Sequence, residues 1–252
     1  MNSTTVSILG VRITPTTVAA ALAVITSWIR SGHRGYICVA AVHLIMECQR
    51  NPSLKKGVNG ANLVVADGMP LVWVSRALGH HTERIYGPLL MEKLCALAQR
   101  QQWNIFFLGG SRGQGKALIK KIKQKFPRLS VVGTMDTPRK TLTNKENSLA
   151  IQQINMARPH IVFVGLGCPY QEKWMIDNYH QLRANVLIGV GAAFNFLSGA
   201  EKQAPLWIQG VGLEWLYRFT QNPRALWHRY TVMNISFVFK ITKQLVSAWR
   251  LK

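Results

Sequence analysis

The sequence predicts an α/β protein with a doubly wound, mainly parallel, Rossmann-like sheet and a C-terminal helical appendage rich in basic and aromatic residues. Three observations predict this fold. Apolar strand-like runs alternate with helical patterns as far as residue 204. The strand runs are continuously apolar, as in strands buried on both faces. Two late runs, IVFVGLG (161–167) and VLIGVG (186–191), end in Gly-x-Gly before helical patterns, which is typical of phosphate or nucleotide sites at the edge of a parallel sheet.

The elements follow in chain order. The segment SILGVRIT (7–14) predicts a small hairpin or edge strand, and 18–28 predicts a buried helix, because Thr17 is a good cap and Pro15 precedes it. No basic segment precedes 18–28, which disfavours a signal peptide. Strands are expected at 36–41, 62–66, 104–110, 129–133, 160–167 and 185–191. Helices are expected near 43–52, 69–79, 88–101, 113–126, 145–157 and 170–182.

The pattern changes near Pro205, so we expect a core over 1–204 and an appendage over 205–252. The appendage holds four of the eight tryptophans and a single acid, Glu214, and two or three helices broken near Asn222-Pro223 fit it best. Aromatic rings interleaved with Arg and Lys are typical of a segment that lies on an anionic membrane surface. A helical pair packed on the sheet is the alternative. No apolar run approaches the ~20 residues of a membrane-spanning helix.

The charge balance of 31 basic and 10 acidic side chains, a net +21, predicts an anionic partner without choosing among nucleic acid, lipid and phosphorylated substrate. Only three aspartates are present: Asp67, Asp136 and Asp177. The four cysteines lack C-x-x-C spacing, and three lie in apolar runs, which indicates reduced core thiols and a cytoplasmic compartment. We expect no metal site and no cofactor.

The segment GGSRGQGKA (109–117) nearly spells a phosphate-binding loop, but Ala117 replaces the hydroxyl residue that would hold magnesium, which disfavours an ATPase. Gly110 and Gly115 have the right spacing and Lys116 is present, so two interpretations stay open: a Gly-rich turn that lets a diphosphate approach the backbone, or a structural tight turn. The six basic residues from Lys116 to Arg128 indicate a solvated helix face or a phosphate contact.

Asp67 ends a buried strand, where α/β enzymes place catalytic groups, and a general base needs such a carboxylate. The alternative is an Asx turn or a helix cap. His43 is a candidate base or ligand, although a lone histidine at a helix start is more often structural. Arg84, in RIYGPLL, is a candidate for neutralising a diphosphate; the alternative is an ordinary surface arginine, although the flanking Ile, Tyr and Gly indicate a defined loop. Gln171 and Glu172 either cap the helix they begin or bind a ribose, uracil or sugar hydroxyl.

These motifs together resemble one family. ADGMP, RIYGPLL, FFLGGSRG, VGLGCPYQEKW, GVGAAFNFLSG and QAPLWIQGVGLEWLYR occur in the order and spacing of the WecG/TagA/CpsF glycosyltransferases, over about residues 5–230. The resemblance implies transfer of a hexose or N-acetylhexosamine from a UDP-sugar donor to a polyprenyl-diphosphate-linked sugar acceptor, with inversion and without an essential metal. It also implies a peripheral enzyme on the cytoplasmic face of the bacterial inner membrane, in teichoic acid, common antigen or exopolysaccharide assembly. The GVGAAF and RIYGP forms look closer to the exopolysaccharide branch, which transfers glucose.

Carried over by position, Asp67 matches the proposed general base and Arg84 an arginine near a diphosphate. Arg218 matches one of the arginines of the appendage, and Gln171 with Glu172 a polar pair beside the nucleotide. Departing UDP would be stabilised by these arginines and by backbone amides. Substrate or nucleotide contacts are expected at His43, Gly68, Gly87, Gly109, Gly110, Gly167, Pro169, Gln171, Glu172, Gly191, Asn195 and Arg218.

The sequence departs from the family where Val39 and Ala41 replace polar residues, and where Leu89 and Asn195 each replace an aspartate. These departures imply either a changed donor specificity or a catalytically weakened paralogue. A basic nucleic-acid-binding module with a Rossmann-like core is the rival from another class. Apolar runs beside the aromatics favour lipid over nucleic acid. An NAD(P)-dependent enzyme is disfavoured because no G-x-G-x-x-G is followed by an acidic ribose partner. Family members form dimers or trimers, so a homo-oligomer is also considered.

Overall fold

The computed structural model describes residues 5–137, 141–205, 207–208 and 212–250. Six parallel strands form the central sheet, in the spatial order β4-β3-β8-β7-β5-β6. They are β3 (Gly35–Ala40), β4 (Leu63–Ala66), β5 (Asn104–Gly109), β6 (Ser130–Met135), β7 (Ile161–Gly165) and β8 (Val186–Gly189). This arrangement confirms the predicted fold class, and each predicted strand lies within about two residues of an observed one.

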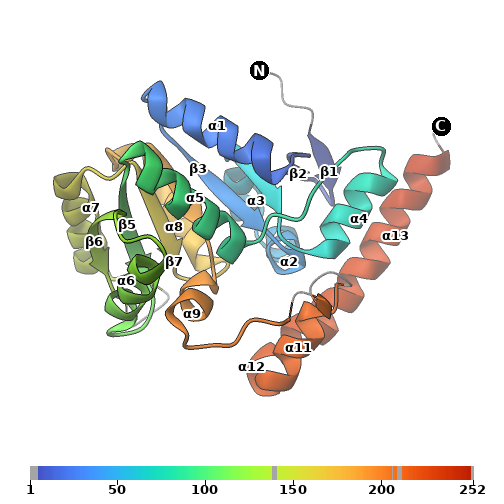
Figure 1. Cartoon of the computed structure of the whole chain (residues 1–252). Helices are drawn as coiled ribbons and strands as arrows, with labels where there is room; N and C mark the ends of the chain where they lie inside the picture. The colour runs from blue at the N-terminus through green and yellow to red at the C-terminus, as the bar shows by residue number, and fades with distance from the viewer. Residues whose placement is uncertain (1–4, 138–140, 206, 209–211, 251–252) are drawn as a thin grey trace.

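Helices cover both faces of this sheet (Figure 1). One face carries α1 (Val18–Arg30), α5 (Gly87–Gln101), α6 (Gln114–Lys125) and α9 (Ala193–Ser198). The other carries α2 (Val42–Arg50), α3 (Pro52–Asn59), α4 (Met69–Ala77), α7 (Asn144–Ala157) and α8 (Tyr170–Asn178), which continues as a 3₁₀ turn over Tyr179–Gln181. Alternate residues of each strand serve the two cores: Ile37 and Val39 pack toward α1 and α5, whereas Cys38 and Ala40 pack toward α2.

The hairpin predicted near the N-terminus is present as β1 (Val6–Ile8) and β2 (Val11–Ile13), which pair antiparallel. The prediction missed one helix, α3. Its start is marked by Asn51, whose side chain accepts a hydrogen bond from the amide of Leu54, and by Pro52 in the first turn. These cap and proline signals are present in the sequence, but the helix itself is short.

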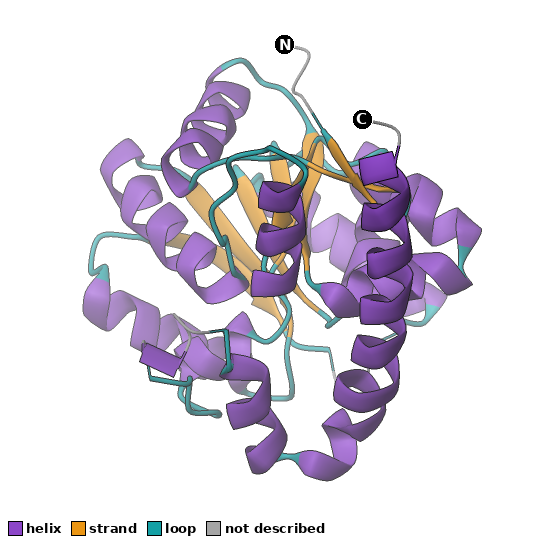
Figure 2. Ribbon diagram, turned by 90° about the vertical axis from the view of Figure 1, so that its right-hand side faces the viewer, coloured by secondary structure: helices purple, strands orange, loops and turns teal. Residues whose placement is uncertain are grey.

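The appendage contains α11 (Glu214–Gln221), α12 (Pro223–His228), a π-helical turn over Arg229–Met233 and α13 (Asn234–Arg250). The break between α11 and α12 falls at Asn222-Pro223, as predicted. Figure 2 shows α13 running along one side of the molecule. Its inward face adds Phe237 and Ile241 to the buried core that contains the hairpin and α2.

Hydrogen bonds also connect the appendage to the hairpin. The Gln244 side chain accepts from the amide of Leu9 and donates to the carbonyl of Ser7. The appendage therefore packs against the core through α13 and the π-helical turn, although the domain boundary near residue 204 stays a prediction. Among the residues described, no helix combines the length and the apolarity needed to cross a bilayer.

Candidate active site

One cavity of about 920 Å³ lies at the edge of the sheet where all six parallel strands have their carboxyl ends. Residues that follow β3, β4, β5, β7 and β8 form its floor, and α11 with the π-helical turn covers it from the appendage side. Arg50, Arg84, Arg218 and Arg229 all line it, against the acids Glu47, Asp67 and Glu214. A cavity of this size, with an excess of positive charge, suits a substrate with a phosphate or diphosphate group.

Asp67 is positioned by the end of β4. Its amide donates to the carbonyl of Ala40 at 2.8 Å, which adds one more rung between β4 and β3. The side chain then projects into the cavity, with 32% of its surface accessible. Asp67 is therefore a carboxylate held by the sheet itself and open to a ligand.

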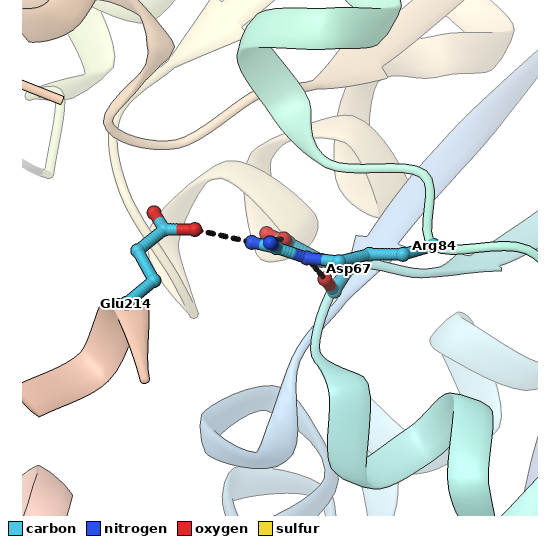
Figure 3. Close-up of polar contacts among 3 residues, drawn as sticks. All are labelled: Asp67, Arg84 and Glu214. Carbon is cyan, nitrogen blue, oxygen red and sulfur yellow. Dashed lines mark hydrogen bonds and ion pairs between the residues drawn. The ribbon is translucent and has the colours of Figure 1, made fainter. Parts of the chain in front are cut away.

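Arg84 reaches the same place from the segment between α4 and α5. The amide of Ile85 donates to the carbonyl of Ala66 at 2.8 Å, so this segment runs beside the end of β4. The Arg84 Nε group donates to the Asp67 carbonyl, and a terminal nitrogen lies 3.6 Å from the Asp67 carboxylate. That same nitrogen donates to Glu214 of α11, so one guanidinium joins the sheet edge to the appendage (Figure 3).

The surroundings of Asp67 change its proton affinity. Burial among protein atoms raises the pKa of the Asp67 carboxyl from 3.8 to about 6, Arg84 opposes this rise, and Glu214 adds to it. The pKa of a carboxyl near the working pH is what a general base requires, since it is ionised at neutral pH and still binds a proton. Arg218 and Arg229 also lower this pKa from the appendage.

Gln171 and Glu172 lie in the first turn of α8 and face different surroundings. Gln171 lines the cavity and accepts a hydrogen bond from the amide of Gly191 at 2.9 Å, so it closes the turn after β8. Glu172 is fully buried behind it and accepts from the Gln171 side chain at 2.8 Å. Burial raises the pKa of Glu172 to about 7. Glu172 thus orients Gln171 from below and does not line the cavity.

The Gly-rich segment after β5 has its amides occupied by Asp136, which follows β6. The two Asp136 carboxylate oxygens accept from the amides of Gly113 and Gly115 at 2.7 and 2.9 Å. This carboxylate occupies the position that a phosphate takes in a phosphate-binding loop. The structural interpretation of this turn is therefore the better one for Gly113 and Gly115, whereas Gly110 lines the cavity.

Asn195, in the first turn of α9, links this helix to α6 and to the segment that follows α9. Its side-chain oxygen accepts from Gln114 at 2.7 Å, and its side-chain nitrogen donates to Glu201 at 2.6 Å. An aspartate at this position would repel Glu201, whereas the asparagine present here donates a hydrogen bond to it. Of the other departures from the family pattern, Val39 and Ala41 line the cavity and Leu89 does not.

The structure brings most of the predicted site residues together. Those that line the cavity are Asp67, Arg84, His43, Gly68, Gly110, Gly167, Gln171, Gly191, Asn195 and Arg218. Gly87, Gly109, Pro169 and Glu172 do not line it. Gly87 and Gly109 have packing roles: an added Cβ would lie 2.4 Å from the Val190 carbonyl at Gly87 and 2.7 Å from the Gly165 backbone at Gly109.

The contributors that sequence reasoning missed include Asp136, Gln114 and Glu214, and also the lining residues Glu47, Arg50 and Arg229. The sequence contains one signal for Glu214, which is the only acid of a strongly basic segment. Gln114 and Asp136 carried no comparable signal, because their partners come from distant elements. Within the described residues, no group of three or more His, Cys, Asp or Glu side chains is arranged to hold a metal ion.

The raised pKa of Asp67 predicts a pH-dependent stability. Between pH 3.8 and about 6 the folded chain binds this proton and the unfolded chain releases it, so the free energy of unfolding falls as pH rises. Asn does not titrate, so the free energy of unfolding of the Asp67→Asn variant lacks this decrease with pH. We expect Asp67→Asn to be more stable than the wild type by about 1 kcal/mol at neutral pH, with no gain near pH 4, in urea unfolding. Asp177→Asn, on the exposed side of α8, is the control. An equal difference at both pH values would contradict the assignment.

Comparison with known proteins places these features in a family. Residues 6–251 match the glycosyl transferase WecG/TagA/CpsF family. Among individual relatives, an N-acetylglucosaminyldiphosphoundecaprenol N-acetyl-beta-D-mannosaminyltransferase of Bacillus subtilis is 32% identical over 66% of this chain and 63% of its own length. Proteins of the same name from two Staphylococcus aureus strains are 28% identical over 86% of this chain and 85% of theirs, and 26% identical over 96% and 94%. The chain is therefore a glycosyltransferase of the WecG/TagA/CpsF family.

Proposed function

We propose that this chain transfers a hexose or N-acetylhexosamine from a UDP-sugar to a sugar linked to undecaprenyl diphosphate, with inversion. The main support for this proposal is that Asp67 and Arg84 lie side by side in a cavity lined by several arginines. The relatives' names supply the class of acceptor, a diphosphoundecaprenol-linked sugar. The two donor candidates are an N-acetylmannosamine donor, whose sugar the relatives' names contain, and a glucose donor.

The reaction follows from the charges. The acceptor hydroxyl oxygen attacks the anomeric carbon of the donor, and Asp67 takes the hydroxyl proton as the new carbon–oxygen bond forms. The bond from the anomeric carbon to the phosphate oxygen breaks, and UDP leaves with the electron pair. Arg84 and Arg218, both on the cavity wall, stabilise the negative charge that develops on the departing diphosphate. Attack from the face opposite the leaving group inverts the anomeric centre.

A membrane-facing role for the appendage is proposed from the outer face of α13. Its exposed apolar side chains recur at helical spacing: Ile235, Val238, Phe239, Val246 and Trp249. Lys240 and Lys243 lie on the same helix, and a face of this kind suits an anionic bilayer surface. We therefore propose peripheral attachment to the cytoplasmic face of the inner membrane. Self-association into a homo-oligomer remains a separate proposal.

Turnover tests the transferase. We expect UDP release from at least one member of a UDP-sugar panel that includes glucose, N-acetylglucosamine and N-acetylmannosamine donors, only when a short-chain lipid-diphosphate-sugar acceptor is present. Asp67→Asn should lower this rate by about a hundredfold or more, because the attacking hydroxyl loses its base. Asp177→Asn is the matched control and should retain the rate. Binding of UDP without turnover for every donor would instead support a weakened paralogue.

Vesicle binding tests the surface. We expect the full chain to sediment with vesicles that contain phosphatidylglycerol, and the double variant Phe239→Ser/Trp249→Ser to bind about tenfold more weakly or less, because each substitution removes an exposed apolar anchor. Met156→Ser, an equally exposed apolar residue on α7, is the control. Point variants are preferable to truncation, since α13 also contributes to the buried core. Salt-sensitive binding to a polynucleotide, without vesicle binding, would contradict the proposal and favour the nucleic-acid alternative.

A further inference from the structure

Glu214 is the only acid between residues 205 and 252, and it is the appendage's one ion-pair contact with the sheet edge among the described residues. It lies in the first turn of α11, and its side chain is only 14% exposed. It makes no capping contact there, because the cap residue is Leu213 and no side-chain capping hydrogen bond forms. Its carboxylate instead points at Arg84 (Figure 3). Capping of α11 therefore does not account for its position.

The Arg84 guanidinium has two carboxylates beside it and hydrogen-bonds to only one. Its terminal nitrogen donates to Glu214 and lies 3.6 Å from the nearest Asp67 carboxylate oxygen, which is longer than a hydrogen bond. The Tyr86 ring packs on the guanidinium, whose centre lies 4.6 Å from the ring centroid. Arg84 is therefore fixed at Nε by the Asp67 main-chain carbonyl, at its terminal nitrogen by Glu214 and on its face by Tyr86, while the Asp67 carboxylate keeps its hydrogen-bonding capacity.

We propose that Glu214 is a positioning residue for the transfer reaction: it holds Arg84 away from the Asp67 carboxylate, so that Asp67 remains free to accept the acceptor's proton. The inference rests on the proposed function. It assigns no contact between Glu214 and substrate, since Glu214 acts through Arg84.

The electrostatics around Asp67 agree with this role. The charged groups that act on it come from three elements: Arg84 before α5, Glu214 and Arg218 on α11, and Arg229 on the π-helical turn. Burial is the largest influence and raises the pKa of Asp67, Glu214 also raises it, and the three arginines lower it, which together leave the pKa at about 6. Without the Glu214 charge, Arg84 would move onto Asp67 and form a charge-assisted hydrogen bond, which makes a carboxylate a weaker base.

The test uses the full chain and the pH dependence of kcat/KM. For the wild type we expect activity to rise with pH around a midpoint near 6, where Asp67 loses its proton. Glu214→Gln should lower kcat about tenfold and move this midpoint down by about one pH unit, since Asp67 would then pair with Arg84. Glu214→Asp should restore part of both losses. Glu92→Gln, which removes an equal charge from a surface pair with Lys125, should change neither.

Two results would overturn the inference. The first is a pH profile of kcat/KM whose midpoint is the same in an active wild type and in Glu214→Gln. A lower rate without a shifted midpoint would reflect only a weakened contact between α11 and the core. The other comes from unfolding, which needs no turnover. The difference in free energy of unfolding between the chain with Asp67 and the Asp67→Asn variant changes with pH as Asp67 binds or releases its proton. This difference is measured twice, once in the otherwise wild-type chain and once in chains that also carry Glu214→Gln. We expect its pH midpoint to be lower in the Glu214→Gln background, and an equal midpoint in the two backgrounds would contradict the inference.

These readouts separate this inference from the proposed function. A wild type that shows no turnover with any donor contradicts the proposed function, and the unfolding comparison still decides whether Glu214 keeps Arg84 off Asp67. If the wild type turns over and Glu214→Gln leaves the pH midpoint unchanged in both assays, only the inference about Glu214 is contradicted and the proposed function stands.

Discussion

The site depends on the contacts of the Arg84 guanidinium, which lies between Asp67 at the sheet edge and Glu214 of the appendage. Asp67 is fixed by β4, Arg84 by the segment that follows Ala66, and Glu214 by α11. Three segments far apart in sequence thereby meet at one charge. Both side chains of the Arg84–Glu214 pair are mostly buried, at 16% and 14% exposure, so removing Arg84 would leave the Asp67 and Glu214 carboxylates without the cation that they share.

The same region shows how the protein distributes negative charge. Only ten acids are available against 31 bases, and several of them contact main-chain amides or arginines near the cavity. The Asp136 carboxylate accepts hydrogen bonds from the main-chain amides of Gly113 and Gly115, and the Glu201 carboxylate accepts one from the side-chain amide of Asn195. Arginines such as Arg218 and Arg229 remain on the cavity wall, where they favour a polyanionic ligand. The excess of basic residues thus acts locally as well as through the net charge.

Much of the fold could be predicted because its signals are local. Each buried strand is a continuous apolar run, and parallel strands bring their carboxyl ends to one edge. Asp67, Gly167 and Gly191, each recognised in the sequence after such a run, line the cavity at that edge. Glu214 and Asp136 could not be placed in this way, because their partners lie 130 residues away and about 20 residues away on other elements. Pairing across elements is decided by packing, and a single sequence carries no periodic signal for it.

The glycines illustrate the same limit. Gly109 and Gly110 are adjacent in one motif, yet only Gly110 lines the cavity, while Gly109 has a positive φ of 113° and packs against β7. A Gly-rich motif predicts that backbone atoms approach something closely. Whether the neighbour is a ligand or another strand depends on the sheet order, which places β5 beside β7.

A crystal structure of the full chain with UDP would locate the diphosphate relative to the three segments that meet at Arg84. We expect the phosphates to lie within hydrogen-bond distance of Arg84 or Arg218, and the Asp67 carboxylate to face the β-phosphate on the side where the donor sugar would be attached. We expect Asp136 to remain bound to Gly113 and Gly115. UDP bound to the Gly-rich turn in place of the Asp136 carboxylate, with Asp67 remote from the phosphates, would contradict this expectation.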